Sequence, residues 1–145
     1  MGLNQVFQET DTQKSLVADL MKLIDEQVSG KGGIGGMGLK AAYGAVKGVK
    51  PGYIQGALER LLPEALDALD PIWSEGVQKG DPVGYLSQNA SRSADAVLSV
   101  TDARIEKTDN GVVRGAYNKL RKSVKGDVEE AIPGLAKILG NYTTS

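Results

Sequence analysis

The sequence predicts an all-α protein: a single-domain bundle of about six or seven short-to-medium helices. Apolar residues recur at three- and four-residue spacing along most of the 145 residues, and the alternation typical of strands is almost absent. Helix start and stop signals divide this pattern into segments with short connections. Because no linker or second zone of composition interrupts the chain, we expect one domain over residues 1–145, with residues 1–9 and 141–145 as loose ends.

The first helix is expected to begin at Thr10, which forms a capping box with Gln13 and takes the N-cap position. One apolar stripe follows at helical spacing, made of Leu16, Val17, Leu20, Leu23, Ile24 and Val28. Ser29 and Gly30 then provide an ordinary glycine stop.

A glycine-rich run follows between Gly30 and Gly56, with ten glycines, four lysines and no acid. Leu39, Tyr43 and Val46 still recur at helical spacing, so we expect a helix over residues 35–49. Small residues on a helix permit close approach, either within the fold, between subunits or around a ligand. The candidate interface or ligand slot comprises Gly36, Lys40, Tyr43, Gly44, Lys47 and Gly48.

Proline residues mark the expected helix starts in the middle of the chain. Pro51 opens a helix, Pro63 opens a further turn, and Asp70-Pro71 and Asp81-Pro82 each pair an N-cap aspartate with a proline at the first helical position. From Pro82 a long helix is expected to reach about residue 108, with a polar stretch over residues 87–93 that can break it.

The C-terminal third begins with a turn at Asp109-Asn110-Gly111. A short helix is expected around residues 113–120 and a last one over residues 124–139, which Pro133 should kink or split. This region also holds a basic block without acids, the candidate basic patch Arg114, Lys119, Arg121, Lys122 and Lys125. Such blocks form solvated faces that complement acidic helices, or surfaces for an anionic lipid or an acidic partner.

The composition narrows the classes of function. The chain has no cysteine and no histidine, which removes thiolate chemistry, the commonest general base and the commonest metal ligand, so we predict no catalytic residue, no metal site and no cofactor. The net charge of −1 and the scarcity of aromatic residues among the basic ones make nucleic acid an unlikely partner. No apolar run approaches the ~20 residues of a membrane span, and the start resembles no secretory signal, so a cytoplasmic location is expected.

Three stretches of the chain resemble a small family of helical bacterial proteins of unknown function, found in actinobacteria and cyanobacteria. Its landmarks here are Lys50-Pro51-Gly52, Leu62-Pro63-Glu64, Asp70-Pro71 with Trp73, Asn110-Gly111 and Ala116-Tyr117. The resemblance spans most of the chain. It implies a bacterial cytoplasmic protein and carries over no catalytic residue.

Three hypotheses of function follow. The leading one is a non-enzymatic helical interaction module that binds protein, chiefly another copy of itself, because a glycine-rich segment lies beside charged helices. The alternative is a carrier of an apolar or lipid-like ligand or a binder of an anionic membrane surface, with Lys31, Lys40, Lys47 and Lys50 near the head group. The third is a divalent-metal-dependent enzyme that uses carboxylates such as Glu64 with Asp67, or Glu129 with Glu130.

Overall fold

The computed structural model describes residues 3–143, apart from the side chains of Asn4, Val6 and Ile34 and the surroundings of Gly35. The regular secondary structure of this part of the chain is entirely helical, with short connections and no strand, which confirms the all-α single-domain prediction. The elements are α1 (Leu3–Val6), α2 (Thr10–Gly30), α3 (Gly33–Lys47), α4 (Tyr53–Gln78), α5 (Pro82–Gln88), α6 (Ala90–Lys107) and α7 (Gly111–Thr143).

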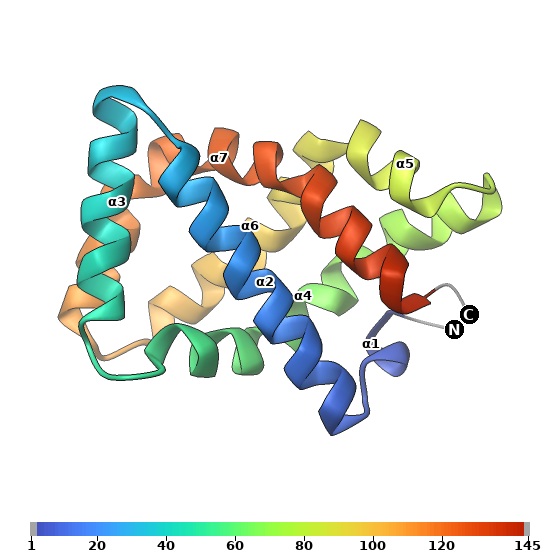
Figure 1. Ribbon diagram of the computed structural model, residues 1–145, viewed down its shortest axis with the longest axis horizontal. Helices are drawn as coiled ribbons and strands as arrows, with labels where there is room; N and C mark the ends of the chain where they lie inside the picture. Colours follow the sequence, from blue (N-terminus) through green and yellow to red (C-terminus); the bar gives the residue numbers. More distant parts are fainter. Residues whose placement is uncertain (1–2, 144–145) are drawn as a thin grey trace.

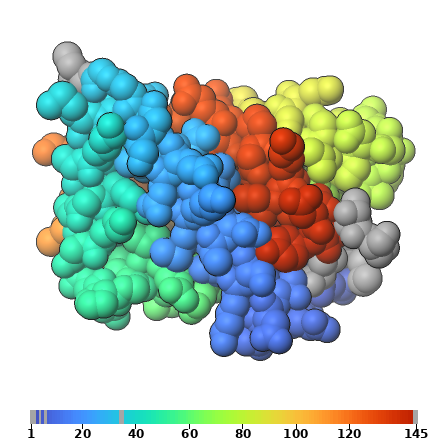
Figure 2. Space-filling model, in the orientation of Figure 1, coloured from blue at the N-terminus to red at the C-terminus, as the bar shows by residue number. Residues whose placement is uncertain are grey.

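Two long helices organise the bundle. Helix α7 packs against α2, α3, α5 and α6, and α4 packs against α1, α2, α5 and α6. Figure 1 shows α2 crossing in front of α4 and α6, with α3 along the left edge and α5 at the opposite end. The space-filling view shows α3 as an outer edge of the molecule, beside α2 (Figure 2).

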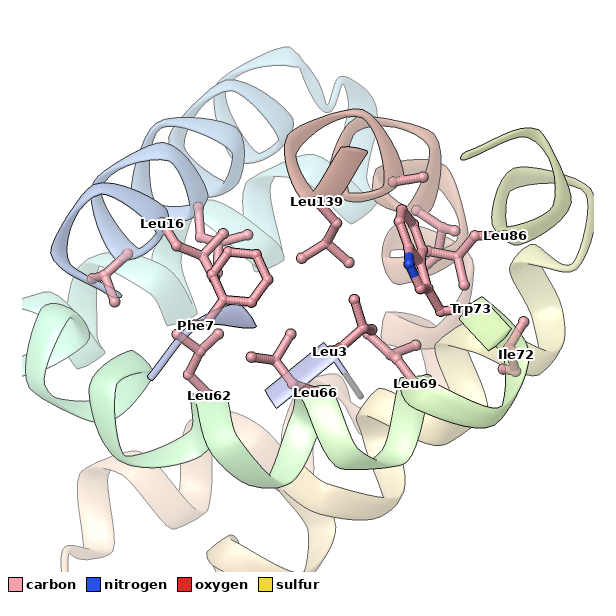
Figure 3. Packing of buried hydrophobic residues seen from close by; sticks show 14 residues of the cluster. Leu3, Phe7, Leu16, Leu62, Leu66, Leu69, Ile72, Trp73, Leu86 and Leu139 are labelled. Carbon is pink, nitrogen blue, oxygen red and sulfur yellow. The ribbon is translucent and has the colours of Figure 1, made fainter. Parts of the chain in front are cut away.

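The core lies where α4 faces α2 and α7. Leu62, Leu66 and Leu69 recur along one side of α4 and point toward Leu16 of α2 and Leu139 of α7 (Figure 3). All five side chains are buried. The three- and four-residue spacing that predicted these helices therefore also selects the faces that meet.

The N-terminal segment belongs to this core, which corrects the expectation that residues 1–9 are loose. Leu3 and Phe7 are each only 1% exposed, and the backbone N–H of Leu3 donates to Asp70 Oδ1 at 2.9 Å. The Phe7 ring packs edge-on against Tyr142, with 5.6 Å between ring centroids. The segment was too short to show a helical period. At the other end α7 continues through Thr143, so residues 141–143 of the expected loose tail are helical. Residues 144–145 lie outside the described residues.

Pro63 and Pro71 begin no new helix, contrary to the predicted starts, and Pro133 does not split α7, one of the two outcomes predicted for it. Helix α4 continues through Pro63 and Pro71, and α7 continues through Pro133. All three prolines are exposed. Because the backbone carbonyl four residues earlier loses its N–H partner on a solvent-facing side, water can replace that partner and the helix continues.

The start signal at Asp81-Pro82 is confirmed, because Asp81 caps α5 by accepting a hydrogen bond from Gly84 N at 3.0 Å. Asn110 lies in the expected turn and also caps α7, which the sequence did not predict: its Oδ1 accepts from Val112 N and Val113 N. The expected long helix is interrupted at Asn89, between α5 and α6, and this residue lies inside the polar stretch that was expected to break it. Thr10 is not the N-cap of α2: Glu9 takes that position and makes no side-chain capping bond.

Candidate functional site

A largely apolar pocket of about 320 Å³ lies between five helices, and we call it the central pocket. Its buried floor consists of Leu20, Val28, Leu62, Leu66, Leu69, Ile132 and Leu139. Half-buried side chains from all five helices form the walls, among them Leu23, Leu39, Leu58, Val97 and Leu135 of α2, α3, α4, α6 and α7. The pocket is partly open to solvent and falls within the ~300–1,000 Å³ range of small-molecule sites.

Three polar residues line the central pocket: Gln27, Thr101 and Asp127. Two of them are already engaged within the fold. Thr101 Oγ1 donates to Leu98 O at 3.1 Å and lies 2.6 Å from Tyr117 Oη, and Asp127 Oδ1 pairs with Lys31 Nζ at 2.6 Å. The pocket therefore presents mainly apolar surface, and two of its three polar lining residues already have partners within the fold.

A second pocket of about 300 Å³ adjoins the central pocket, and we call it the basic pocket. Leu61 of α4 and Thr101 of α6 line both pockets. The basic pocket has an apolar floor from residues such as Ile54 and Val113, and Arg60, Arg104 and Lys107 are its charged lining residues. Arg104 binds Glu64 through two nitrogens, at 3.0 and 3.2 Å, and donates to Arg60 O.

A hydrogen-bond network supports the wall of the basic pocket. Tyr117 Oη donates to Asp102 Oδ1, and the guanidinium of Arg121 binds both oxygens of Asp102, at 2.8 and 3.0 Å. Hydrogen bonding from Arg121 holds the pKa of Asp102 below its usual value. Burial, together with the bond to Asp102, raises the pKa of Tyr117 to about 12. Asp102 is thus an anion paired with its own cation.

A polar pocket lies on another side of the central pocket, at the end of α2. It is lined by Glu26, Gln27, Gly30, Lys31, Gly32 and Glu130, and Gln27 also lines the central pocket. Lys31 reaches from the connection between α2 and α3 to Asp127, and its hydrogen bond to that carboxylate raises the pKa of the Lys31 amine. The charge that Lys31 brings to the polar pocket is therefore balanced by Asp127.

The candidate slot residues of α3 do not line the central pocket; Leu39 is the α3 residue that does. Gly36 is buried against the backbone of Lys31, whereas a side chain added at Gly44 would meet open space. Tyr43 donates to Asp25 of α2, and Lys47 lies 4.0 Å from the same carboxylate. Lys40 and Gly48 are exposed. The prediction that another helix of the same fold packs closely over Gly44 is therefore wrong.

Glycines that do permit close approach lie elsewhere. A Cβ at Gly76 would stand 2.7 Å from Pro82 Cα and 2.9 Å from Tyr85 Cβ, so α4 and α5 meet at this position. A Cβ at Gly140 would stand 2.6 Å from Val83 Cγ2. These glycines are single residues in ordinary helical sequence, and no repeat in the sequence distinguished them.

The candidate basic patch is largely partnered within the fold. Arg121 binds Asp102, Lys125 lies 3.0 Å from Asp95, and Arg114 donates to the carbonyls of Ile105, Glu106 and Thr108 at the end of α6. Lys119 and Lys122 are exposed. The patch is thus mainly the face of α7 that complements the acids and the C-terminus of α6.

The carboxylates of the enzyme hypothesis do not converge in a described metal site. Glu64 is bound by Arg104, and residues 3–143 contain no grouping of acidic side chains suited to a metal ion. Among the helices of the same residues, none is both long and apolar enough to cross a bilayer.

Comparison with known sequence families gives one match, over residues 3–143, to DUF6918, a family of unknown function. The chain belongs to DUF6918. This agrees with the resemblance to a helical family of unknown function seen in the sequence. No curated protein and no solved structure matches the chain.

The sequence did not predict either pocket as a site. Leu61 and Thr101 sit in ordinary amphipathic helices, and Arg60 of α4 lies more than one helix away along the chain from Arg104 and Lys107 of α6. Only the packing of α4 against α6 brings them to one place.

Proposed function

We propose that this protein binds a small apolar, lipid-like ligand in the central pocket. The observation that carries the proposal is the size and lining of that pocket: about 320 Å³, bounded almost entirely by leucine, isoleucine, valine and alanine side chains. Protein interiors pack densely, with few voids larger than a water molecule, whose share of the liquid is ~30 Å³. An apolar pocket of this size that is partly open to solvent favours a ligand that covers its apolar walls.

The chemistry of the lining favours an apolar ligand over a polar one. Thr101 and Asp127 already have partners, so they gain little from a ligand's polar groups. Apolar cavities of this kind bind apolar molecules in preference to water. Binding of this kind requires no catalytic group. We also expect the protein to act in the cytoplasm of a bacterium.

Native mass spectrometry of gently purified protein, followed by organic extraction, tests for a resident ligand. We expect excess mass that the extraction recovers as an apolar compound. In parallel, calorimetric titration with decanol measures the capacity of the pocket. Ala131 lines the pocket, so Ala131→Phe should fill it and abolish decanol binding.

The matched control is Ala18→Phe, which places the same ring on an exposed position of α2. It should leave decanol binding unchanged. Equal binding by both variants, or no decanol binding by the wild-type protein together with no resident mass, would refute the proposal.

Self-association is a second candidate, and the exposed face of α3 favours it. Met37 is 72% exposed, and Ala41, Gly44, Ala45 and Gly48 lie on the same side of the helix, all exposed. Such a smooth face permits close contact with a second helix. The double substitution Gly44→Leu and Gly48→Leu should then change the oligomeric state in analytical ultracentrifugation. Unchanged assembly and stability in that variant would exclude this interface.

A further inference from the structure

The central pocket adjoins the basic pocket. Leu61 and Thr101 belong to the lining of both, so the two pockets share part of their walls. The two spaces differ in character: the central pocket is almost wholly apolar, and the basic pocket combines an apolar floor with cations. This juxtaposition suits a molecule with an apolar chain and a charged end.

Two of the three positive charges at the basic pocket are uncompensated by an ion pair among the described residues. Of its three cations, Arg104 is held by Glu64, while Arg60 and Lys107 have no ion-pair partner among the described residues. No acidic residue lines the basic pocket. The nearby carboxylate of Asp102 is bound by Arg121 and therefore does not offset Arg60 or Lys107.

The polar pocket has the reverse sign. Glu26 and Glu130 line the polar pocket, and the one lysine there is neutralised by Asp127. An anionic group would be repelled at the polar pocket and attracted at the basic pocket. Of the two pockets that adjoin the central pocket, the basic pocket is therefore the one that suits an anionic head group.

From this arrangement we infer that the ligand of the central pocket is an amphipathic anion, a single apolar chain whose carboxylate, sulfate or phosphate head group binds Arg60, Arg104 and Lys107. This inference rests on the proposed function and adds the chemical class of the ligand. The chain occupies the central pocket, and the head group lies in the adjoining basic pocket. Arg104, fixed by Glu64, provides an oriented guanidinium, and Arg60 and Lys107 supply the free positive charge.

Calorimetric titration with three chains of equal length tests the inference: decanoate, decanol and decylamine, each below its aggregation concentration. We expect decanoate to bind about tenfold more tightly than decanol, because hydrogen bonds to charged groups add roughly that much affinity. Decylamine should bind more weakly than decanol. Acetate, which has the head group without the chain, should show no binding at the same concentrations.

The double substitution Arg60→Gln and Lys107→Gln removes the two free cations and breaks no ion pair of the described residues. It should weaken decanoate binding about tenfold and leave decanol binding within about twofold. The matched control is Lys119→Gln with Lys122→Gln, which makes the same change in net charge at exposed positions outside the pockets. The control should bind decanoate as the wild type does.

The outcomes separate the two levels of the argument. Decanol binding without a preference for decanoate, a preference for decylamine, or equal losses in the two double variants would overturn the anion assignment and leave the apolar pocket standing. Failure of both decanol and decanoate to bind, together with no resident mass in the purified protein, would overturn the proposed function itself. Flotation with phosphatidylglycerol vesicles that depends on Arg60 and Lys107, without decanoate binding, would show a membrane surface to be the anion and overturn the single-chain ligand.

Discussion

Filling the central pocket should stabilise the empty protein, and Ala131→Leu is the perturbation that measures this. Ala131 is half-buried on α7 and lines the pocket. Leucine has three more carbons than alanine, and burial of each contributes about 0.8 kcal/mol, or about 2.4 kcal/mol together. Ordering the leucine side chain costs about 0.5–1 kcal/mol. The expected gain in the free energy of unfolding is therefore about 1.5 kcal/mol.

Urea denaturation of ligand-stripped protein is the assay. The midpoint should rise with an unchanged m-value, and the melting temperature should rise by about 3–6 °C. Ala18→Leu, at an exposed position of the neighbouring α2, is the control and should change stability by less than about 0.5 kcal/mol. A loss of stability in Ala131→Leu with no change in the control would refute the reasoning, because it would mean that the walls already meet and leave no space.

Three further predictions concern the scaffold. Gly76→Ala should destabilise the fold by about 1–3 kcal/mol, because the added Cβ would meet α5, whereas Gly44→Ala should stabilise it by about 0.5–1 kcal/mol in the same urea assay; a loss of stability at both positions would contradict the assigned environments. Phe7→Ala should cost about 3–5 kcal/mol, and a loss below 1 kcal/mol would show that the N-terminal segment is not docked in solution. The pKa of Asp102 is lowered in the folded state. The ionised Asp102 side chain therefore adds to the free energy of unfolding above the unfolded pKa of about 3.9, and this contribution is lost as pH falls through the lower folded pKa. Urea midpoints between pH 7 and pH 2.5 should therefore fall more steeply for the wild type than for Asp102→Asn, and parallel curves would contradict this assignment.

The ion pairs of the charged residues could not be predicted from the sequence, because the partners lie on different helices. The block from Arg114 to Lys125 was recognisable as basic, but its partners Asp95 and Asp102 belong to another helix, so the sequence left open whether it was a binding face. In contrast, the sequence did not predict a basic site at Arg60, Arg104 and Lys107, because each of them has acidic neighbours along the chain. Their importance comes from which neighbours reach them in space.

The glycines show the same limit in packing. The glycine-rich run around Gly44 and Gly48 predicted close approach within the fold, between subunits or around a ligand, yet the space over Gly44 is open within the fold, and close contacts between helices occur at Gly76 and Gly140. A missing side chain permits close approach, but only the position of a second helix decides whether the approach occurs. The prolines follow a related rule, since Pro63, Pro71 and Pro133 are exposed and the helices continue through them.

The sequence by itself determined the helical class, most of the helix-forming segments, the cap at Asp81, and the core faces of α2, α4 and α7. These depend on local conformational preference and on the period of apolar residues, both of which are written along the chain. Only the tertiary structure decided that the N-terminal segment is buried, that five helices leave a pocket between them, and that three cations gather beside it. Those features depend on distances between residues far apart in the sequence, which packing sets and local pattern does not.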